Sequence, residues 1–569
     1  MLWQEKDANM KLSRITAFIT AAALAVPFAA CSIKINAGSS SETTTASETS
    51  TAAPSTEAVS ADNPNQISSP YSQYDPVDTD LIREHAEKLL ADIKIADNSD
   101  AVREDIDVLI DDTDAAVESS SRAQVHYCLN FSDEDAEAAY DEVSEEAYIA
   151  LQFARYAFAH CWNSEYKDLV KDHVDEKSLD YYTYPNLSIK RLEGYSRVDY
   201  SLSDEYTDRY YDIVNKVSEI DEDDEDALED IKLEAAELYL EIMKDISAED
   251  FYANYNRDYS PELVFDLADT AYTQITQISD KFVQAYVAAG GADDDGTVPE
   301  ELADTFTAIQ KYASKLSPEI GKAADQLVNE KQYIITNDEN AYPGCATISL
   351  PHSHTAAIFV NNADETAFFS AVHEFGHYYA TQNFKTHAVD SLTNMDVAEI
   401  QSQAIEFLFT RFYEDFYGDL ADAKRVEDLS SALNTILAAF VVGKFEYSVL
   451  KDVSTLEPQD VIDIWDECLN GLSDTEFYMI PHIFERPGYY ISYAVSGLAA
   501  LQIWRESISD PAGALTMYNK IAKIDADSPD TQFQKTLSAC GMDNVLTKSY
   551  IVSITDSLEE YLDSIIENE

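Results

Sequence analysis

The chain has 569 residues, with 107 acidic and 38 basic side chains and a formal net charge of -69. This charge excludes a nucleic-acid partner, because phosphate binding needs basic patches, and it predicts a strongly solvated surface. The length predicts two or more lobes, and the low numbers of Gly (15) and Pro (16) favour a largely helical protein.

Residues 1–31 are predicted to be a lipoprotein-type signal peptide. Lys11 and Arg14 precede an apolar stretch, Ile15 to Ala30, which is shorter than the ~20 residues of a membrane span. The small residues before Cys31 resemble a bacterial lipobox, whose cysteine carries a lipid after cleavage. We therefore expect a secreted protein held on the outer face of a bacterial membrane by its N-terminal lipid only. The alternative is an ordinary signal peptide with an incidental cysteine.

Three further segments follow from composition and periodicity. Residues 32–75 are rich in Ser and Thr and nearly lack large apolar side chains, which predicts a flexible tether. Residues 76–340 show helical apolar spacing and are predicted to form a helical N-terminal lobe. Residues 341–569 are predicted to form the catalytic lobe, for the reasons that follow.

Two short strands are predicted at the start of this last segment. Cys345–Leu350 and Ala357–Val360 are apolar and rich in β-branched residues, and the segment between them contains Pro351. They directly precede a helical pattern with Phe368, Val372 and other apolar residues on one face. The fold class predicted is mainly α, with a small β-sheet next to this helix.

The helix contains the pentapeptide His373-Glu374-Phe375-Gly376-His377. Histidines four residues apart on a helix lie on one face. Zinc accepts imidazole ligands, and a catalytic site leaves one position open for water. Glu374 lies about 100° around the helix, where it is badly placed as a ligand and well placed to act on that water. We therefore predict His373 and His377 as zinc ligands and Glu374 as the general base.

A carboxylate in a second helical pattern completes the predicted metal site. Glu399 follows His377 by 22 residues, after Asp396 as the predicted N-cap. Two antiparallel helices bring Glu399 to the histidines as third ligand, for one zinc ion per chain, and Gly376 permits their close approach. Glu406 lies two turns further and is predicted to orient a ligand, the alternative being a surface carboxylate.

These motifs resemble those of the zinc oligopeptidases oligoendopeptidase F and thimet oligopeptidase. The resemblance spans about residues 340–505 and rests on His373–His377, Cys345–Asn362, Ala398–Ser402, Lys444–Glu446, Ile480–His482 and Gly488–Gly497. It implies a helical, two-lobed ellipsoid split by a deep channel that admits short peptides. It also implies zinc bound by two histidines and a glutamate.

The resemblance assigns roles to three more residues. His482 matches a histidine that binds substrate and stabilises the oxyanion, while Tyr490 and Tyr493 match a tyrosine pair that contacts the substrate carbonyl. Tyrosines at i and i+3 share one helical face, and a phenol can donate to an oxyanion. Which tyrosine is the main donor stays open, as does a purely structural role for each. Cys345–Leu350 matches an edge strand that pairs with the substrate backbone.

The predicted function is hydrolysis of internal peptide bonds in short oligopeptides outside the cell. A peptidyl-dipeptidase or carboxypeptidase with the same zinc site is one alternative. It needs a basic group for the substrate's terminal carboxylate, and Arg486 is the local candidate. A catalytically silent peptide-binding lipoprotein is the other alternative, although binding alone does not need Glu374. The oligomeric state is not indicated.

Overall fold

The computed structural model describes most of the chain after residue 68. The described residues are 69–183, 204–220, 224–246, 250–253, 255–293, 302, 304–338, 340–342, 344–361, 367–473 and 475–567. The predicted signal peptide, Cys31 and nearly all of the predicted tether lie outside these residues.

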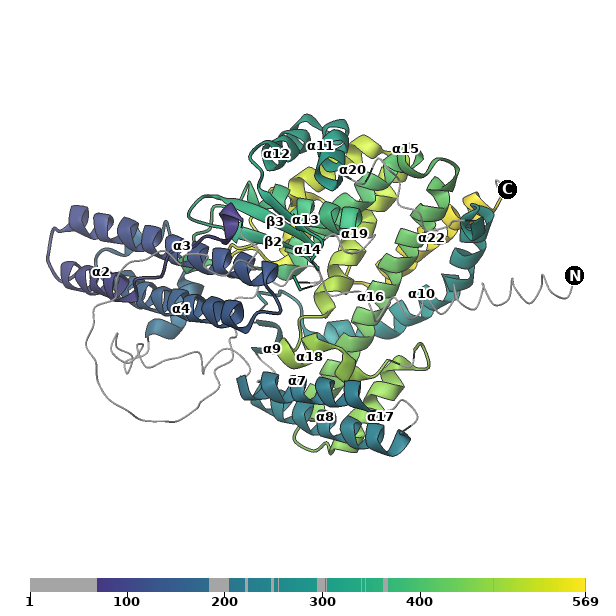
Figure 1. Cartoon of the computed structure of the whole chain (residues 1–569), viewed down its shortest axis with the longest axis horizontal. Helices are drawn as coiled ribbons and strands as arrows, with labels where there is room; N and C mark the ends of the chain where they lie inside the picture. Colours follow the sequence, from purple (N-terminus) through teal and green to yellow (C-terminus); the bar gives the residue numbers. More distant parts are fainter. Residues whose placement is uncertain are drawn as a thin grey trace, which may run out of the picture.

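An N-terminal helical region projects from one side of the molecule (Figure 1). It comprises α2 (Thr79–Asp92), α3 (Ser99–Leu129), α4 (Glu134–Trp162), α5 (Lys167–Val170) and η2 (Glu176–Thr183). Asp133 caps α4, and three acidic residues in the first turn favour this helix start through the helix dipole. The region has its own apolar core, which also takes in Ala388 and Val389 from the distant segment before α14.

The main core is built from helices on both sides of residue 340. Those before it are α7 (Asp204–Glu219), α8 (Glu225–Asp245), α9 (Asp250–Ala253), α10 (Pro261–Ala288), α11 (Thr305–Leu316) and α12 (Pro318–Asn329). Those after it are α13 (Ala367–Thr381), α14 (Met395–Phe409), α15 (Tyr413–Tyr417), α16 (Ala421–Asp452), α17 (Pro458–Leu469), α18 (Pro481–Glu485), α19 (Ile491–Ser509), α20 (Pro511–Ile521), α21 (Phe533–Cys540) and α22 (Lys548–Glu567). The predicted lobe boundary at 340 stays a prediction, while α10 packs across it against α16 and α22 (Figure 1).

The described residues form one three-stranded sheet with the order β1-β3-β2. β1 (Tyr333–Thr336) pairs in parallel with β3 (Thr355–Asn361), and β2 (Cys345–Leu350) pairs antiparallel with β3. The predicted bounds of β2 agree with the structure, and its place at the edge of the sheet is confirmed. Both β2 and β3 pack against α13, so the prediction of a mainly helical fold with a small sheet beside this helix is confirmed. The deep channel stays a prediction.

One helical stretch in the described residues, Met395–Asp452, is long and apolar enough to cross a membrane by length and composition. In its most apolar window, 72% is buried inside the protein, as in the core helix of a folded domain. Short turns at Thr410–Phe412 and Gly418–Leu420 also interrupt it.

Candidate active site

Two helices cross closely where the predicted metal ligands lie. α13 carries His373 and His377, and α14 carries Glu399. A Cβ atom on Gly376 would lie 2.6 Å from the carbonyl oxygen of Gln401 and 2.6 Å from Cα of Ser402. Both are backbone atoms that cannot move without the helix, so the glycine sets how closely α14 approaches α13. The close approach predicted at Gly376 is confirmed.

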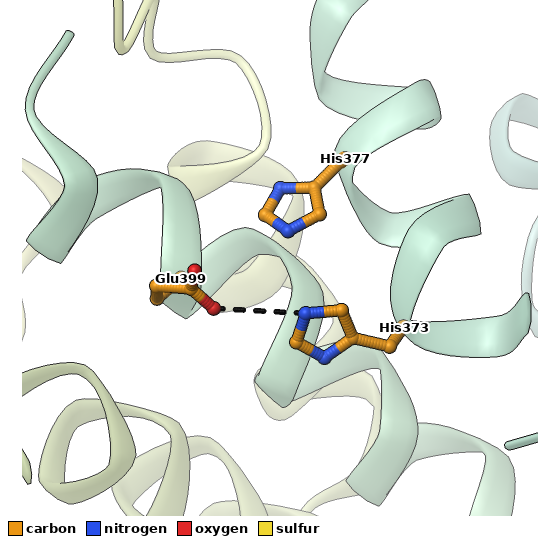
Figure 2. A group of neighbouring side chains, drawn as sticks. All are labelled: His373, His377 and Glu399. Atoms are coloured by element: carbon orange, nitrogen blue, oxygen red, sulfur yellow. Dashed lines mark ion pairs between the residues drawn. The ribbon is translucent and has the colours of Figure 1, made fainter. Parts of the chain in front are cut away.

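The structure brings the three predicted ligands together. The donor atoms of His373, His377 and Glu399 lie within 4.8 Å of one another, and the three side chains converge on one space (Figure 2). The Nε2 atom of His373 is 3.6 Å from Oε2 of Glu399. Tetrahedral zinc, with bonds of about 2.0–2.2 Å, holds its ligand atoms roughly 3.3–3.6 Å apart. The donor types and this spacing therefore fit zinc.

Glu406 contacts the ring nitrogen of His373 that faces away from Glu399. Its Oε1 atom lies 2.6 Å from Nδ1 of His373, which leaves Nε2 facing Glu399. Burial would lower the pKa of His373, but the hydrogen bond and charge of Glu406, together with Glu399 and Glu374, raise it to about 9. A carboxylate on the far nitrogen fixes the tautomer and orientation of a metal-binding imidazole. The position predicted for Glu406, next to the predicted ligand His373, is confirmed.

Glu374 is completely buried beside the ligands. Thr347 on β2 lies with its Oγ1 atom 2.8 Å from Oε2 of Glu374 and 2.8 Å from the Glu374 carbonyl oxygen. Burial raises the pKa of Glu374 to about 7, against the lowering effects of His373 and Thr347. Its Oε1 atom has no hydrogen-bond partner among the described residues. A buried, unpartnered carboxylate oxygen is costly, which is typical of a group that acts on a bound molecule.

His482, Tyr490 and Tyr493 form a second cluster around the start of α19. Ring centroids are 5.7 Å apart for His482 and Tyr490, 6.3 Å for His482 and Tyr493, and 5.4 Å for the two tyrosines. Burial and the charge of Arg486 lower the pKa of His482 to about 3, and burial raises the pKa of Tyr490. At neutral pH His482 is therefore neutral and Tyr490 keeps its proton. α19 packs against α14, the helix that carries Glu399.

Sequence reasoning missed a buried ion pair between Arg257 and Asp396. The Nε atom of Arg257 lies 3.1 Å from Oδ2 of Asp396. The prediction that Asp396 caps α14 is wrong, because Asn394 is the N-cap and its side chain accepts a hydrogen bond from the backbone N–H of Val397. Asp396 lies inside the helix and faces Arg257. Thr347 was also missed, since its role depends on a contact with a helix 27 residues away in the chain.

Neither a protein-family model nor a curated protein matches the sequence. Solved structures do share the fold, over nearly the whole length of each. A protein assigned as an oligoendopeptidase F has a TM-score of 0.64 at 16% identity, covering 86% of this chain and 98% of its own. A second such protein, from Bacillus anthracis str. Ames, has a TM-score of 0.66 at 14% identity, covering 86% and 97%.

A third structure, PZ peptidase A with an inhibitor, gives a TM-score of 0.63 at 16% identity and covers 86% of this chain and 98% of its own. The resemblance to oligoendopeptidase F predicted from the motifs is thus confirmed in the fold, over 86% of the chain and therefore well beyond residues 340–505. At these identities the likeness establishes the fold.

Proposed function

We propose that this chain is a zinc-dependent metallopeptidase that hydrolyses internal peptide bonds of short oligopeptides. The observation that carries the proposal is the convergence of His373, His377 and Glu399 beside the buried carboxylate of Glu374. A binding protein has no use for a buried carboxylate with an unpartnered oxygen next to a metal site, whereas a hydrolase needs one. The shared fold with peptidase structures supports the same reaction class.

His373, His377 and Glu399 would hold the zinc ion, one per chain. When bound, zinc supplies a Lewis acid that polarises a carbonyl and lowers the pKa of a water toward about 7. Glu374 then accepts a proton from the attacking water and later donates it to the leaving amine. Thr347 fixes one carboxylate oxygen and leaves the other to face the water.

The cluster at the start of α19 supplies the second half of the proposed mechanism. The phenols of Tyr490 and Tyr493 would donate hydrogen bonds to the carbonyl oxygen as negative charge develops on it. His482 is neutral and would bind the substrate through a ring N–H. β2 is the edge strand beside α13, and it would pair with the substrate backbone. This mode of binding favours extended, unfolded peptides.

A quenched fluorescent peptide of about ten residues, blocked at both ends, tests the proposal directly. The protein used is the purified chain without residues 1–31. We expect it to cleave the peptide internally, to lose this activity with a chelator, and to regain it when zinc is added. Glu374→Gln should bind zinc with the same stoichiometry and lose about 10³-fold or more in kcat, since it removes the proton acceptor. Near-normal turnover of Glu374→Gln would remove Glu374 from the mechanism.

The position of Arg486 supports an exopeptidase as the second candidate function. Its charge acts on His482, so a cation lies beside a proposed substrate-binding residue. A guanidinium there could bind the terminal carboxylate of a substrate. An exopeptidase would cleave only peptides with a free C-terminus, and Arg486→Gln would weaken this cleavage. That result would indicate a peptidyl-dipeptidase or carboxypeptidase instead of an endopeptidase. Bound zinc with no cleavage of either peptide would indicate the silent peptide-binding lipoprotein.

We further propose that the chain acts outside the cell, anchored by lipid on Cys31. Support comes only from the basic, apolar and small-residue pattern before this cysteine. Cys31→Ser should move the protein from the membrane fraction to the soluble fraction without changing peptide turnover. An unchanged distribution between the fractions would contradict lipid anchoring.

A further inference from the structure

Arg257 lies far from every motif residue in the sequence, in the segment between α9 and α10, yet its side chain is completely buried. The guanidinium is packed against aromatic rings, 4.5 Å from the ring centroid of Tyr252 and 4.6 Å from that of Tyr255. A buried charge of this kind is costly unless every donor is satisfied. The partners that satisfy it belong to the two halves of the proposed active site.

The first partner is the helix that carries Glu399. Nε of Arg257 is 3.1 Å from Oδ2 of Asp396, and Nη2 is 3.1 Å from Oδ1. Asp396 also accepts hydrogen bonds from the hydroxyls of Tyr259 and Ser492, each at 2.7 Å. Asp396 precedes Glu399 by three residues, about one helical turn. The ion pair therefore fixes α14 at the level of the proposed metal ligand.

The second partner is the turn that leads into α19. Arg257 donates to the carbonyl oxygens of Gly488 and Tyr489, and its Nη2 atom lies 2.7 Å from Oγ of Ser492. The turn is held on its other side by Glu446, which accepts a hydrogen bond of 2.7 Å from the N–H of Gly488. Gly488 has φ +84°, and a Cβ there would lie 3.0 Å from the carbonyl oxygen of Phe251. Tyr490 lies in this turn, and Tyr493 lies in the first turn of α19.

We propose that Arg257 is a positioning residue that fixes the distance between the zinc ligands on α13 and α14 and the tyrosine donors at the start of α19. The inference rests on the proposed function. One planar group contacts Asp396 with one edge and the tyrosine turn with the other, so it spans the two halves. An oxyanion donor acts only within hydrogen-bond distance of the developing charge, and a shift of about 1 Å can cost about 10²-fold in rate. A buried ion pair by itself adds little stability, so stability alone does not account for this one.

Arg257→Lys keeps the charge and removes the bridge, because one ammonium cannot serve a carboxylate and two carbonyls in a fixed planar geometry. Turnover of the blocked fluorescent peptide is measured with the zinc-loaded enzyme and expressed per bound zinc. We expect kcat to fall about tenfold to a hundredfold while KM and zinc stoichiometry change little. Arg505→Lys is the control, since Arg505 lies on α19 itself but contacts Ser553 and Asp543 and not the turn that carries Tyr490. Its kcat should stay within about twofold of the unmodified chain.

A double-mutant cycle separates positioning from simple destabilisation. If Arg257 acts through the tyrosines, Arg257→Lys should cost less than about threefold once Tyr490→Phe and Tyr493→Phe are present. An equal factor in both backgrounds, or unchanged kcat in Arg257→Lys alone, would overturn the proposal. In either case cleavage by the unmodified chain would leave the peptidase assignment intact. Failure of the unmodified, zinc-loaded chain to cleave any peptide would overturn both proposals.

Ser492→Ala decides the matter where Arg257→Lys does not fold. It removes a hydroxyl that bridges Arg257 and Asp396 but leaves their ion pair in place. We expect a loss of about twofold to tenfold in kcat per bound zinc, and again little loss in the background without tyrosine hydroxyls. Unchanged kcat in Ser492→Ala, or the same loss in both backgrounds, would contradict the positioning role.

Discussion

Different interactions stabilise the proposed metal centre and the N-terminal helical region. The N-terminal region, α2 to η2, has an apolar core of its own, with buried carboxylates on α3 at Asp105, Asp114 and Glu118. The proposed metal centre depends on a backbone contact at Gly376 and on charged pairs, Arg257 with Asp396 and His373 with Glu406. Apolar packing tolerates small shifts because it is not directional, whereas hydrogen-bonded charges are sensitive to distance and angle. Stability and site geometry should therefore respond separately to substitutions in the two regions.

The largest expected effect is on the stability of the N-terminal region. Phe158 is fully buried in its core, and Phe158→Ala should destabilise this region by about 3–5 kcal/mol. Calorimetry should show an early unfolding transition of the N-terminal region, while zinc stays bound to the remainder. A single transition with simultaneous loss of zinc would show that the two regions unfold as one unit.

Gly376→Ala should weaken zinc binding more than it lowers stability. The added methyl would overlap two backbone atoms of α14, with an overpacking cost of about 1–3 kcal/mol, and it would push Glu399 from the histidines. We expect lower zinc affinity with a modest fall in Tm, measured by competition with a chromogenic chelator and by calorimetry. Gly513→Ala, on α20, is the control, because the nearest atoms to its Cβ are side-chain atoms of Asp510 and Glu506 and not the backbone of another helix. Equal zinc affinity in both variants would refute the spacing role of Gly376.

Glu406→Gln tests whether the contact between Glu406 and His373 contributes to zinc affinity, without changing a proposed ligand. The variant keeps the size of the side chain and removes the charge that holds Nδ1 of His373. Loss of such a partner lowers metal affinity by about 10–100-fold, and the melting of the N-terminal region should not change. Unchanged affinity for zinc would mean that the orientation of His373 is fixed by packing alone.

The smallest expected effect concerns pH and the contact between the two regions. His387 lies in the segment that connects α13 to α14. Its Nδ1 atom is 2.8 Å from Oδ2 of Asp114 on α3, and this hydrogen bond raises the pKa of His387. A pKa raised in the folded state means that the contact stabilises fully below pH about 6.5 and weakens as pH rises through the raised value. The difference in Tm between the unmodified chain and His387→Gln should therefore be larger at pH 6 than at pH 9. A difference that does not depend on pH would contradict this.

The parts of the site that could be predicted are those encoded in short spacings. Two histidines four residues apart and a glutamate on the next helix predict the candidate ligands that the structure brings together, and Glu406 follows from helix periodicity. Arg257 could not be predicted, because 139 residues separate it from Asp396 and no local pattern marks it. The sequence does not distinguish Asn394 from Asp396 as N-cap of α14, because both are good caps and only the backbone decides between them. The predicted lobe boundary at 340 depends on the strands expected just after it, and the start of strands does not show which helices pack together.

The packing of α10 between α16 and α22 bears on how this chain folds as it is made. The main core joins Tyr210 to Leu562, so its first helices leave the ribosome long before their last partner exists. At the usual pace of synthesis, that interval is on the order of 20–70 s. The N-terminal region has a nearly complete core after η2 and can fold at once. Helices α8 and α10 instead lack their partners α16, α17 and α22 until each of these has been made. Chaperone dependence during synthesis should therefore concentrate on α7 to α10.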